Sequence, residues 1–413
     1  MATSTQDMVR PGECVDLYYY DGETSKKQCF PTTQNTKFVQ QFQNLTGGSS
    51  VFTSPPNQGI QDVVLEFSFN NPAAGVIAIP RGWGYALIKQ VSFRYGGSSQ
   101  YFLTGDQILQ NALRAQPNRS AVNDLMTLGG QYYDQATNPT IQNATLNAAV
   151  VLTLPHNIPT GVGKAHPLPS DLLTQQIQIT VEIYNPASIF IGAAVAAPAL
   201  AQAQFVVQQV LMNNMGDALA RRVDMAQNAY AFPCEFVQQK QTITGQIANN
   251  LNPSSVVLTG FRSGEVKNLQ VWLTRSSEDT PGAANYSPFK WYLPSSIQMT
   301  YAGDVYARYD YSSSPLWNLI NGNKSPAVDN LSVVVPPAGA PTAFTSLWVE
   351  LPFAQTHEDE DAHHTLIHGK PITNGIVNLT IVPPSAQADW VVNVSYVYNS
   401  TLLFSQGTAD YVF

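Results

Sequence analysis

The 413-residue sequence predicts an all-β protein built from two consecutive antiparallel β-sandwiches. Three observations support this prediction: segments in which apolar and polar residues alternate, Pro- and Gly-rich stretches between them, and a plan of elements that occurs twice in the same order. The chain is long enough for two or three domains of ordinary size, so one small domain is excluded.

Alternation with a period of two recurs along the chain and marks half-buried strands. The clearest case is residues 177–183, IQITVEI, in which Gln178, Thr180 and Glu182 separate four aliphatic residues. Comparable segments are residues 64–70, 91–95, 297–301, 347–353 and 392–398. Turn-forming stretches such as LPHNIPTGVG lie between them, as expected for antiparallel strands joined by loops.

Helices are expected to be few and short. Residues 314–323 have Ser314 at an N-cap position and Pro315 at the first helical position, which is typical of a helix start. Residues 104–116 predict another helix of roughly two to three turns, with an apolar face that includes Leu109. Both helices follow an aromatic segment, so they occupy matching places in the two halves.

One plan of elements occurs twice. Residues 91–113 contain a strand, a Tyr-Gly-Gly turn, an aromatic segment and a helix, and residues 297–320 repeat this order with a Tyr-Ala-Gly turn. The later matches are residues 174–188 with 373–387, and 203–213 with 389–399. Chains rich in β-structure can be aligned loosely, but four matches in one order favour a true repeat. We expect two sandwiches of about 180 to 200 residues, joined near residues 213–232.

Charge is scarce, and its balance is acidic. Only 12% of the residues are charged, against about 25% in average proteins, so the surface must consist mainly of Asn, Gln, Ser, Thr and Tyr. Such a surface tolerates burial against copies of itself. The net charge is −8, and no basic run exceeds pairs such as Lys26–Lys27 and Arg221–Arg222. We therefore expect no direct nucleic-acid binding, which requires clustered cations.

Cysteine usage and apolar segments predict neither a disulfide framework nor a membrane span. Cys14, Cys29 and Cys234 form no CxxC motif and leave an odd thiol, so reduced thiols are expected. Residues 1–16 lack the apolar segment of a secretory signal. Residues 187–207 are interrupted by proline and glutamine, and their continuous apolar part is shorter than the roughly 20 residues that a span requires.

Residues 357–364, HEDEDAHH, gather acidic and histidine side chains in a chain with few charges. His364 and His368 have the spacing that places two metal ligands on one helical face, and Asp361 stands where an HExxH motif has its second histidine. No apolar helical stripe surrounds the motif, and it lies between two predicted strands. We interpret it as a solvated, pH-sensitive loop, with a metal site as the alternative hypothesis. The candidate metal ligands are His357, His363, His364 and His368.

Other motifs give no catalytic site. The GVGKAH stretch at Lys164 resembles the end of a P-loop, but Ile158 replaces its first glycine and Ala165 replaces the Ser or Thr that holds Mg²⁺. No GxSxG elbow is present, and no GxGxxG follows a strand. Carboxylates such as Asp310 and Glu350 are scattered, and sequence separation does not place a glycosidase pair. We predict no catalytic residue, no cofactor and no enzymatic activity.

Two stretches near the middle of the chain share a pattern with one known family. Residues 203–241 run from a strand through a polar turn and an Arg-containing short helix to the lead-in of a second barrel. Residues 260–275 place Lys267 before an apolar strand that contains Trp272.

Two later stretches complete the pattern. Residues 347–381 form a strand, an acidic loop and a strand, and residues 390–413 form a closing strand with Asn399 in a turn and Gly407 near the end. The chain thereby resembles the double jelly-roll major capsid proteins of icosahedral double-stranded DNA viruses, a lineage that includes nucleocytoplasmic large DNA viruses, virophages, adenoviruses and membrane-containing tailless phages. Its loop departs from the family pattern of Pro-Glu-Glu-His and Pro-Ser-Gly, which leaves the branch undetermined.

The resemblance implies two consecutive eight-stranded jelly-roll β-sandwiches with short helices in the connecting loops. The expected parts are an amino-terminal arm (1–36), a first jelly roll (37–214), a linker helix (215–232) and a second jelly roll (233–413). The residues before Lys37 show no alternation, which suggests an arm that runs along the inner face of a shell.

The resemblance also implies a structural function. Homotrimers would form pseudo-hexameric capsomers that tile an icosahedral virion shell, after assembly in the host cytoplasm or nucleus. The expected partners are the chain itself, neighbouring capsomers, penton and minor capsid proteins, and an internal membrane beneath the shell.

Two other functions remain as alternatives. A carbohydrate-binding or hydrolytic β-sandwich predicts a monomer with a glycan ligand. A single jelly-roll shell protein with a projecting domain predicts one barrel and a basic amino-terminal arm, and this sequence has no such arm.

Overall fold

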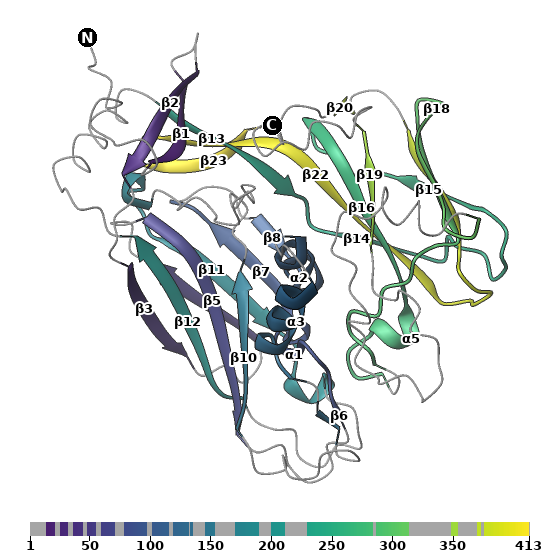
Figure 1. Ribbon diagram of the computed structural model, residues 1–413, viewed down its shortest axis with the longest axis horizontal. Helices are drawn as coiled ribbons and strands as arrows, with labels where there is room; N and C mark the ends of the chain where they lie inside the picture. The colour runs from purple at the N-terminus through teal and green to yellow at the C-terminus, as the bar shows by residue number, and fades with distance from the viewer. Residues whose placement is uncertain are drawn as a thin grey trace.

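Two β-barrels lie side by side in the computed structural model of the chain (Figure 1). The described residues are 14–20, 25–31, 36–43, 48–54, 59–70, 78–96, 101–114, 119–131, 133–134, 145–152, 170–189, 200–210, 229–283, 286–313, 348–353, 370–372 and 376–412. We call the strands from β3 to β12 barrel one and those from β13 to β23 barrel two.

Barrel one consists of two four-stranded antiparallel sheets. In pairing order, its first sheet is β3 (Thr36–Gln43), β12 (Leu200–Val210), β5 (Gly59–Asn70) and β10 (Thr145–Leu152). Its second sheet is β4 (Gly48–Ser54), β11 (Ile177–Ile183), β7 (Ile88–Arg94) and β8 (Tyr101–Leu103). A small ladder joins β6 (Ala78–Ile79) to β9 (Tyr133–Asp134).

Barrel two repeats this construction and adds strands to one sheet. That sheet runs through β19 (Val349–Pro352), β16 (Glu265–Arg275), β22 (Trp390–Ser405) and β13 (Ala229–Val237), with β14 (Gln241–Thr244), β20 (Lys370–Pro371) and β23 (Thr408–Val412) paired beside this path. The other sheet is β15 (Ser254–Leu258), β21 (Val377–Val382), β17 (Ser296–Tyr301) and β18 (Asp304–Asp310).

Both barrels pair their strands in the same order. When the eight main strands of each barrel are numbered along the chain, with β13 and β14 together as the first of barrel two, the sheets pair as 1-8-3-6 and 2-7-4-5 in each. This arrangement is an eight-stranded jelly roll. The predicted fold class is therefore confirmed, and the repeated stretches fall on equivalent strands: β7 and β17, β11 and β21, and β12 and β22.

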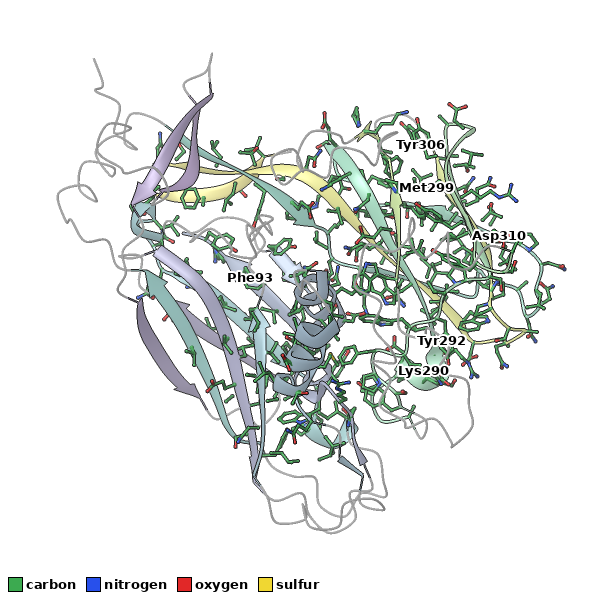
Figure 2. All side chains as sticks on the ribbon, in the orientation of Figure 1. Phe93, Lys290, Tyr292, Met299, Tyr306 and Asp310 are labelled. Atoms are coloured by element: carbon green, nitrogen blue, oxygen red, sulfur yellow. The ribbon has the colours of Figure 1, made fainter. Side chains whose placement is uncertain are left out.

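The alternating residues of the strands form the barrel cores. In β11 the aliphatic residues are buried and the polar residues between them are exposed or half-buried, as predicted. Phe93 of barrel one and Met299 of barrel two occupy equivalent core positions on β7 and β17 (Figure 2). Burial of a large apolar side chain contributes roughly 1.5 to 3 kcal/mol, so these rows stabilise each sandwich.

Short helices close the barrels, as predicted. They are α1 (Trp83–Leu87), α2 (Gly105–Arg114), α3 (Arg119–Leu128) and α5 (Ser276–Asp279), with 3₁₀ turns η3 (Ser170–Leu172) and η4 (Pro186–Ser188). The predicted helix after residue 104 is α2, and Leu109 is buried on it. The sequence analysis missed α1, in which every residue is buried, because so short an apolar run resembles a strand. The helix predicted for residues 314–323 lies outside the described residues.

The amino-terminal segment differs from the predicted arm. Within residues 1–36, β1 (Cys14–Tyr20) and β2 (Ser25–Pro31) form an antiparallel hairpin, and β1 pairs with β13 of barrel two. Strands that extend a sheet edge bond through their main chains and need no alternating core face, so the sequence pattern did not reveal them.

The predicted linker helix is only partly described. Residues 229–232 belong to strand β13, because they continue its pairing with β22, and residues 211–228 lie outside the described residues. In the part of the chain that the structure describes, we find no helix long and apolar enough to cross a membrane.

Candidate functional site: the seam between the barrels

The contact between the two barrels, which we call the seam, is built around a buried glutamine. Gln107, on the first turn of α2, donates its side-chain amide to the carbonyl oxygen of Gln238 at 2.9 Å and to the hydroxyl of Ser395 at 2.7 Å. Gln107 and Ser395 are both buried. Because buried polar groups stabilise only when they are hydrogen-bonded, this amide fixes α2 of barrel one onto β22 of barrel two.

A close contact of two turns forms one end of the seam. The backbone N–H of Thr174, before β11, donates to the carbonyl oxygen of Gly407, between β22 and β23, at 2.9 Å. Gly407 has a φ of 79°, and a Cβ there would lie 2.3 Å from Cγ2 of Thr174. Both the conformation and the space require glycine. The glycine singled out by the sequence pattern therefore serves the contact between the barrels.

Aromatic rings from both barrels pack beside this turn contact. The ring of Tyr101 on β8 lies 4.7 Å from that of Phe236 on β13 and 5.8 Å from that of Tyr411 on β23, measured between centroids. Phe236 and Tyr411 are 5.0 Å apart. The guanidinium of Arg262 lies 5.0 Å from the Phe236 centroid, within the range of a cation–π contact. Aromatic pairs of this kind add roughly 0.5 to 1.5 kcal/mol beyond the area they bury.

An ion pair also crosses the seam. Lys240 Nζ lies 2.6 Å from Asp106 Oδ2, and the two side chains are only 21% and 14% exposed. Burial alone would lower the pKa of Lys240, but the negative charges of Asp106 and Asp279 raise it, so the ammonium remains charged. Burial raises the pKa of Asp279, and the nearby Asp106 charge adds to this rise, while Lys240 opposes it.

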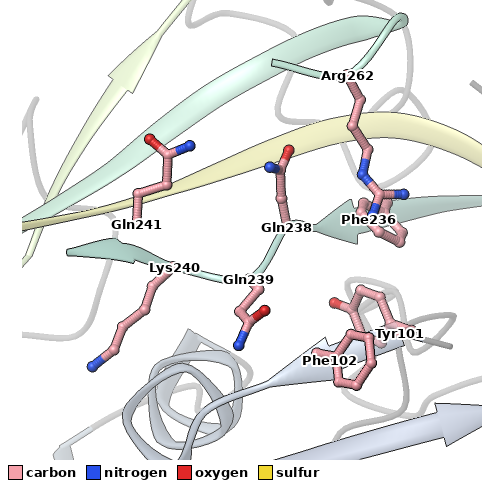
Figure 3. A pocket seen from close by; sticks show the side chains of 8 residues that line it. All are labelled: Tyr101, Phe102, Phe236, Gln238, Gln239, Lys240, Gln241 and Arg262. Atoms are coloured by element: carbon pink, nitrogen blue, oxygen red, sulfur yellow. The ribbon is translucent and has the colours of Figure 1, made fainter. Parts of the chain in front are cut away.

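A small pocket opens between the barrels (Figure 3). Its volume is about 250 Å³. It is lined by Tyr101, Phe102, Phe236, Gln238, Gln239, Lys240, Gln241 and Arg262. The lining combines amides and aromatic rings with two cations, and it contains no carboxylate, thiol or imidazole to act as a general base. We therefore describe the pocket as part of the seam.

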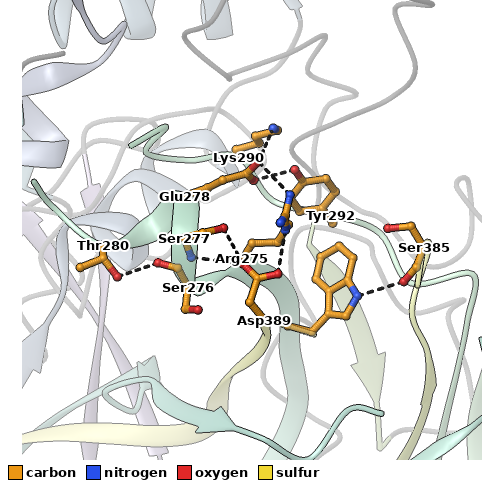
Figure 4. A network of polar contacts seen from close by, with 10 residues as sticks. Arg275, Ser276, Ser277, Glu278, Thr280, Lys290, Tyr292, Ser385 and Asp389 are labelled. Carbon is orange, nitrogen blue, oxygen red and sulfur yellow. Dashed lines mark hydrogen bonds and ion pairs between the residues drawn. The ribbon is translucent and has the colours of Figure 1, made fainter. Parts of the chain in front are cut away.

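A second polar network braces barrel two where β16 runs into α5 (Figure 4). Arg275 Nε lies 2.9 Å from Asp389 Oδ1, and Arg275 Nη1 lies 3.3 Å from Glu278 Oε1. Glu278 also binds Lys290 Nζ at 2.9 Å and accepts a hydrogen bond from the Tyr292 hydroxyl at 2.7 Å. The network fixes the loop after α5.

The loop that this network fixes reaches barrel one. The N–H of Gly282 donates to the carbonyl oxygen of Ser188, in η4, at 2.7 Å. Further along the same loop, Phe289 lies against Gly82, where a Cβ would be 3.6 Å from the Phe289 ring. The α5 loop is therefore a third contact across the seam.

The predicted metal candidates do not enter the described site. His357, His363, His364 and His368 all lie outside the described residues. Among the residues that the structure does describe, no group of three His, Cys, Asp or Glu side chains could hold a metal ion.

The carboxylates considered for catalysis have structural partners. Glu350 is buried and accepts hydrogen bonds from the Trp348 indole at 3.2 Å and the Asn268 amide at 3.3 Å. Asp310 accepts hydrogen bonds from Ser312 and Ser313, which lower its pKa to about 2. These carboxylates stabilise a sheet face and a turn.

Sequence reasoning missed the polar residues of the seam, because their alternation with apolar residues indicated a solvent-exposed face. Asn393 and Ser395 are polar positions of β22 that alternate with apolar ones, which predicts a solvent face, yet both are buried. Gln107 of barrel one hydrogen-bonds to Ser395, whereas Asn393 hydrogen-bonds to Thr242 and Thr274 on neighbouring strands of barrel two.

Comparisons with known proteins agree with this fold. No protein-family model matches the chain, and no curated protein matches its sequence. Among solved structures, PBCV-1 VP54, fitted into a reconstruction of the virophage Sputnik, matches with a TM-score of 0.64 at 12% identity, over 94% of this chain and 99% of that one. The Faustovirus major capsid protein matches with a TM-score of 0.56 at 8% identity, over 91% of both chains.

A third match is the mavirus major capsid protein, with a TM-score of 0.52 at 10% identity, over 95% of this chain and 93% of that one. At such identities the likeness establishes the fold alone. Two jelly rolls of equal strand order, joined in one chain, define the class. The fold is that of the double jelly-roll major capsid proteins, and the resemblance inferred from the sequence is confirmed at this level.

Proposed function

We propose that the chain is a structural major capsid protein, and that its homotrimers form pseudo-hexameric capsomers which tile an icosahedral virion shell. The observation that carries this proposal is the presence of two barrels with one strand order, held together by a buried seam. The solved structures that share the fold along nearly the whole chain are major capsid proteins, which supports the same role.

Symmetry links the two barrels to a shell. Three chains with two similar lobes each give six lobes around a threefold axis, and a six-cornered unit fills a flat lattice through repeated lateral contacts. A low charge density suits flanks that become buried against neighbours, because few charges then lose their hydration.

The proposed role is non-catalytic, and its site of action is the capsid shell of the virion. The net charge of −8 favours a genome that is held by other components, such as a basic core protein or an internal membrane beneath the shell. Penton and minor capsid proteins complete the expected partners. Residues 1–36 would face the inside of the shell, and residues 357–368 would form a solvated loop.

Solution mass tests the proposal directly. Light scattering on the purified protein should give about three times 45.0 kDa, and negative-stain images of the same peak should show a six-cornered outline. A chain that stays monomeric at high concentration would contradict the proposal and direct attention to the glycan-binding alternative, which a glycan array then tests.

Two further measurements address the partners and the histidines. Tight duplex-DNA binding with a steep salt dependence would contradict the proposed absence of genome contact.

Elemental analysis with and without a chelator should find no stoichiometric metal. A bound metal whose removal lowers stability would overturn the assignment of residues 357–368 to a solvated loop.

A further inference from the structure

A row of polar residues on the outer face of barrel two is buried. Glu350 on β19, Gln270 on β16 and Ser395 on β22 lie opposite one another in the ladders, so their side chains point to the same side of the sheet. That side faces barrel one, because Ser395 accepts the hydrogen bond from Gln107. Glu350 is 3% exposed, and the other two residues of the row are fully buried. We call Glu350, Gln270 and Ser395 the polar row.

The middle residue of the polar row is the one whose hydrogen bonds are not accounted for. Ser395 binds Gln107, and Glu350 accepts a hydrogen bond from the Trp348 indole. Within the described part of the chain, neither the nitrogen nor the oxygen of the Gln270 side-chain amide has a hydrogen-bond partner. An amide that loses its hydration without gaining hydrogen bonds destabilises the fold. Gln270 therefore requires a partner that the described protein groups do not supply.

Barrel one brings a second amide of the same kind to the seam. Gln110 lies three residues after Gln107 on α2, and this spacing places both side chains on one side of the helix. Ile108 and Ala112 lie on the other side, in the hydrophobic core. Since the side with Gln107 faces barrel two, Gln110 also lies in the seam. It is fully buried, and neither atom of its amide has a partner among the described residues.

The outer face of β16 holds two more polar atoms of this kind. Asn268 and Trp272 alternate with core residues of β16 and therefore point to the same side as Gln270. Asn268 Oδ1 and Trp272 Nε1 are buried, and no described group hydrogen-bonds to them. Together with the two amides they make six such atoms at one contact. Buried water typically occupies sites of this kind, where it makes about three hydrogen bonds to polar groups that otherwise lack partners.

We propose that the seam binds ordered water molecules, which hydrogen-bond to the side-chain amides of Gln270 in barrel two and Gln110 in barrel one. Water both donates and accepts, so it serves the nitrogen and the oxygen of an amide alike. Its small size suits the full burial of both residues. The seam is thereby a hydrated interface between two barrels and not a continuation of their apolar cores. The inference concerns a single chain and does not depend on the proposed homotrimer.

The sign of a stability change tests the proposal. Gln270→Met and Gln110→Met keep the approximate length of the side chain and remove the amide. Where water is bound, each substitution deprives that water and its other partners of hydrogen bonds, so the urea midpoint should decrease. Where the amide is dry and unsatisfied, an apolar side chain of similar shape should instead raise the midpoint. Gln178→Met, on the exposed side of β11, is the matched control and should leave the midpoint unchanged.

A crystal structure of the wild-type protein tests the same proposal without any substitution. Ordered water should lie at hydrogen-bonding distance, roughly 2.7 to 3.2 Å, from the amide atoms of Gln270 and of Gln110. The corresponding structure of Gln270→Met should lack the water bound at residue 270 and keep the water at Gln110. The wild-type structure decides the question even if both methionine variants fail to fold.

The outcomes are distinct. Ordered water at both amides, together with lowered midpoints of both methionine variants, would establish the hydrated seam. Midpoints that are unchanged or raised would overturn it. Direct hydrogen bonds from these amides to other protein groups, with no water between them, would also overturn it, even if the midpoints decreased. None of these results bears on the capsomer, which the solution mass tests separately, and a monomeric wild-type protein would leave the hydrated seam in place.

Discussion

The two barrels share their strand order but pack different groups against their sheets. Barrel one packs a helix on the core face of β10: Gly84 of α1 sits so close that a Cβ would be 2.9 Å from Ala148 and Val150, which lie opposite the core residues Phe67 and Leu65. Barrel two uses indole rings, because Trp291 lies 6.4 Å from Trp272 and 5.7 Å from Trp348 between centroids. The comparison teaches that alternation and turns determine the topology, while barrels of one topology can differ in the groups that pack against their sheets.

The largest effect should come from the indole cluster of barrel two. Trp291→Ala removes a ring that is almost fully buried between Trp272 and Trp348, and it leaves a cavity that both neighbours border. We expect a loss of about 3 to 5 kcal/mol in the free energy of unfolding, measured by urea denaturation. As a control, Val257→Ala at a 53% exposed position should change stability by no more than about 0.5 kcal/mol. Equal effects of the two variants would contradict the packing described.

The seam ion pair should matter more than a surface ion pair of equal length. Lys240→Met leaves Asp106 partly buried without its cation, and we expect a loss of about 2 to 3 kcal/mol, somewhat below that for a fully buried pair. The matched control is Lys89→Met, whose pair with Glu182 is also 2.6 Å long but is 50% and 39% exposed. Solvent screens that pair, so its removal should have no measurable effect on the urea midpoint.

A smaller effect is expected at the buried amide of the seam. Gln107→Leu keeps the approximate volume but removes the donor that serves Gln238 and Ser395, and we expect a loss of about 1 to 2 kcal/mol. Gln178→Leu on the exposed side of β11 is the control and should be close to neutral. If both substitutions were neutral, the seam would not depend on this hydrogen bond.

The strands and their duplication could be predicted from the sequence, because a core face forces alternation. Residues 177–183 and 297–301 show it, and both became strands with the expected buried rows. The pairing of β1 with β13 could not be predicted, since it extends a sheet edge and needs no core face.

The seam could not be predicted for a different reason. Gln107, Lys240 and Ser395 are types that normally face water, and they are far apart in sequence. A pattern that reports burial within one barrel carries no signal for burial against a second barrel. Gly407 was found only through the resemblance, and its role became clear from the Thr174 contact.

The smallest predicted effect is a difference in pH dependence between two aspartates. Burial raises the pKa of Asp279 above its ordinary 3.8, so ionising this carboxyl is less favourable in the folded state than in the unfolded state. The free energy of unfolding therefore decreases as the pH rises above 3.8 and Asp279 ionises. Burial raises the pKa of Asp389, but the hydrogen bonds from Ser277 and Arg275 together lower it by more, so the pKa lies below its ordinary value. The contribution of Asp389 is therefore present above pH 3.8 and is lost as the pH falls towards its lowered value.

Asparagine substitutions should reveal these opposite signs. Relative to wild type, Asp279→Asn should gain stability as the pH increases from about 4 to 7, because the amide avoids the cost of burying a charge. Asp389→Asn should lose stability relative to wild type as the pH increases from about 2 to 4, because the wild-type carboxylate ionises there and strengthens its hydrogen bonds. Urea midpoints at one protein concentration measure both differences. Curves parallel to wild type for both variants would show that neither aspartate has the assigned shift, and the seam would then contribute no pH dependence through Asp279.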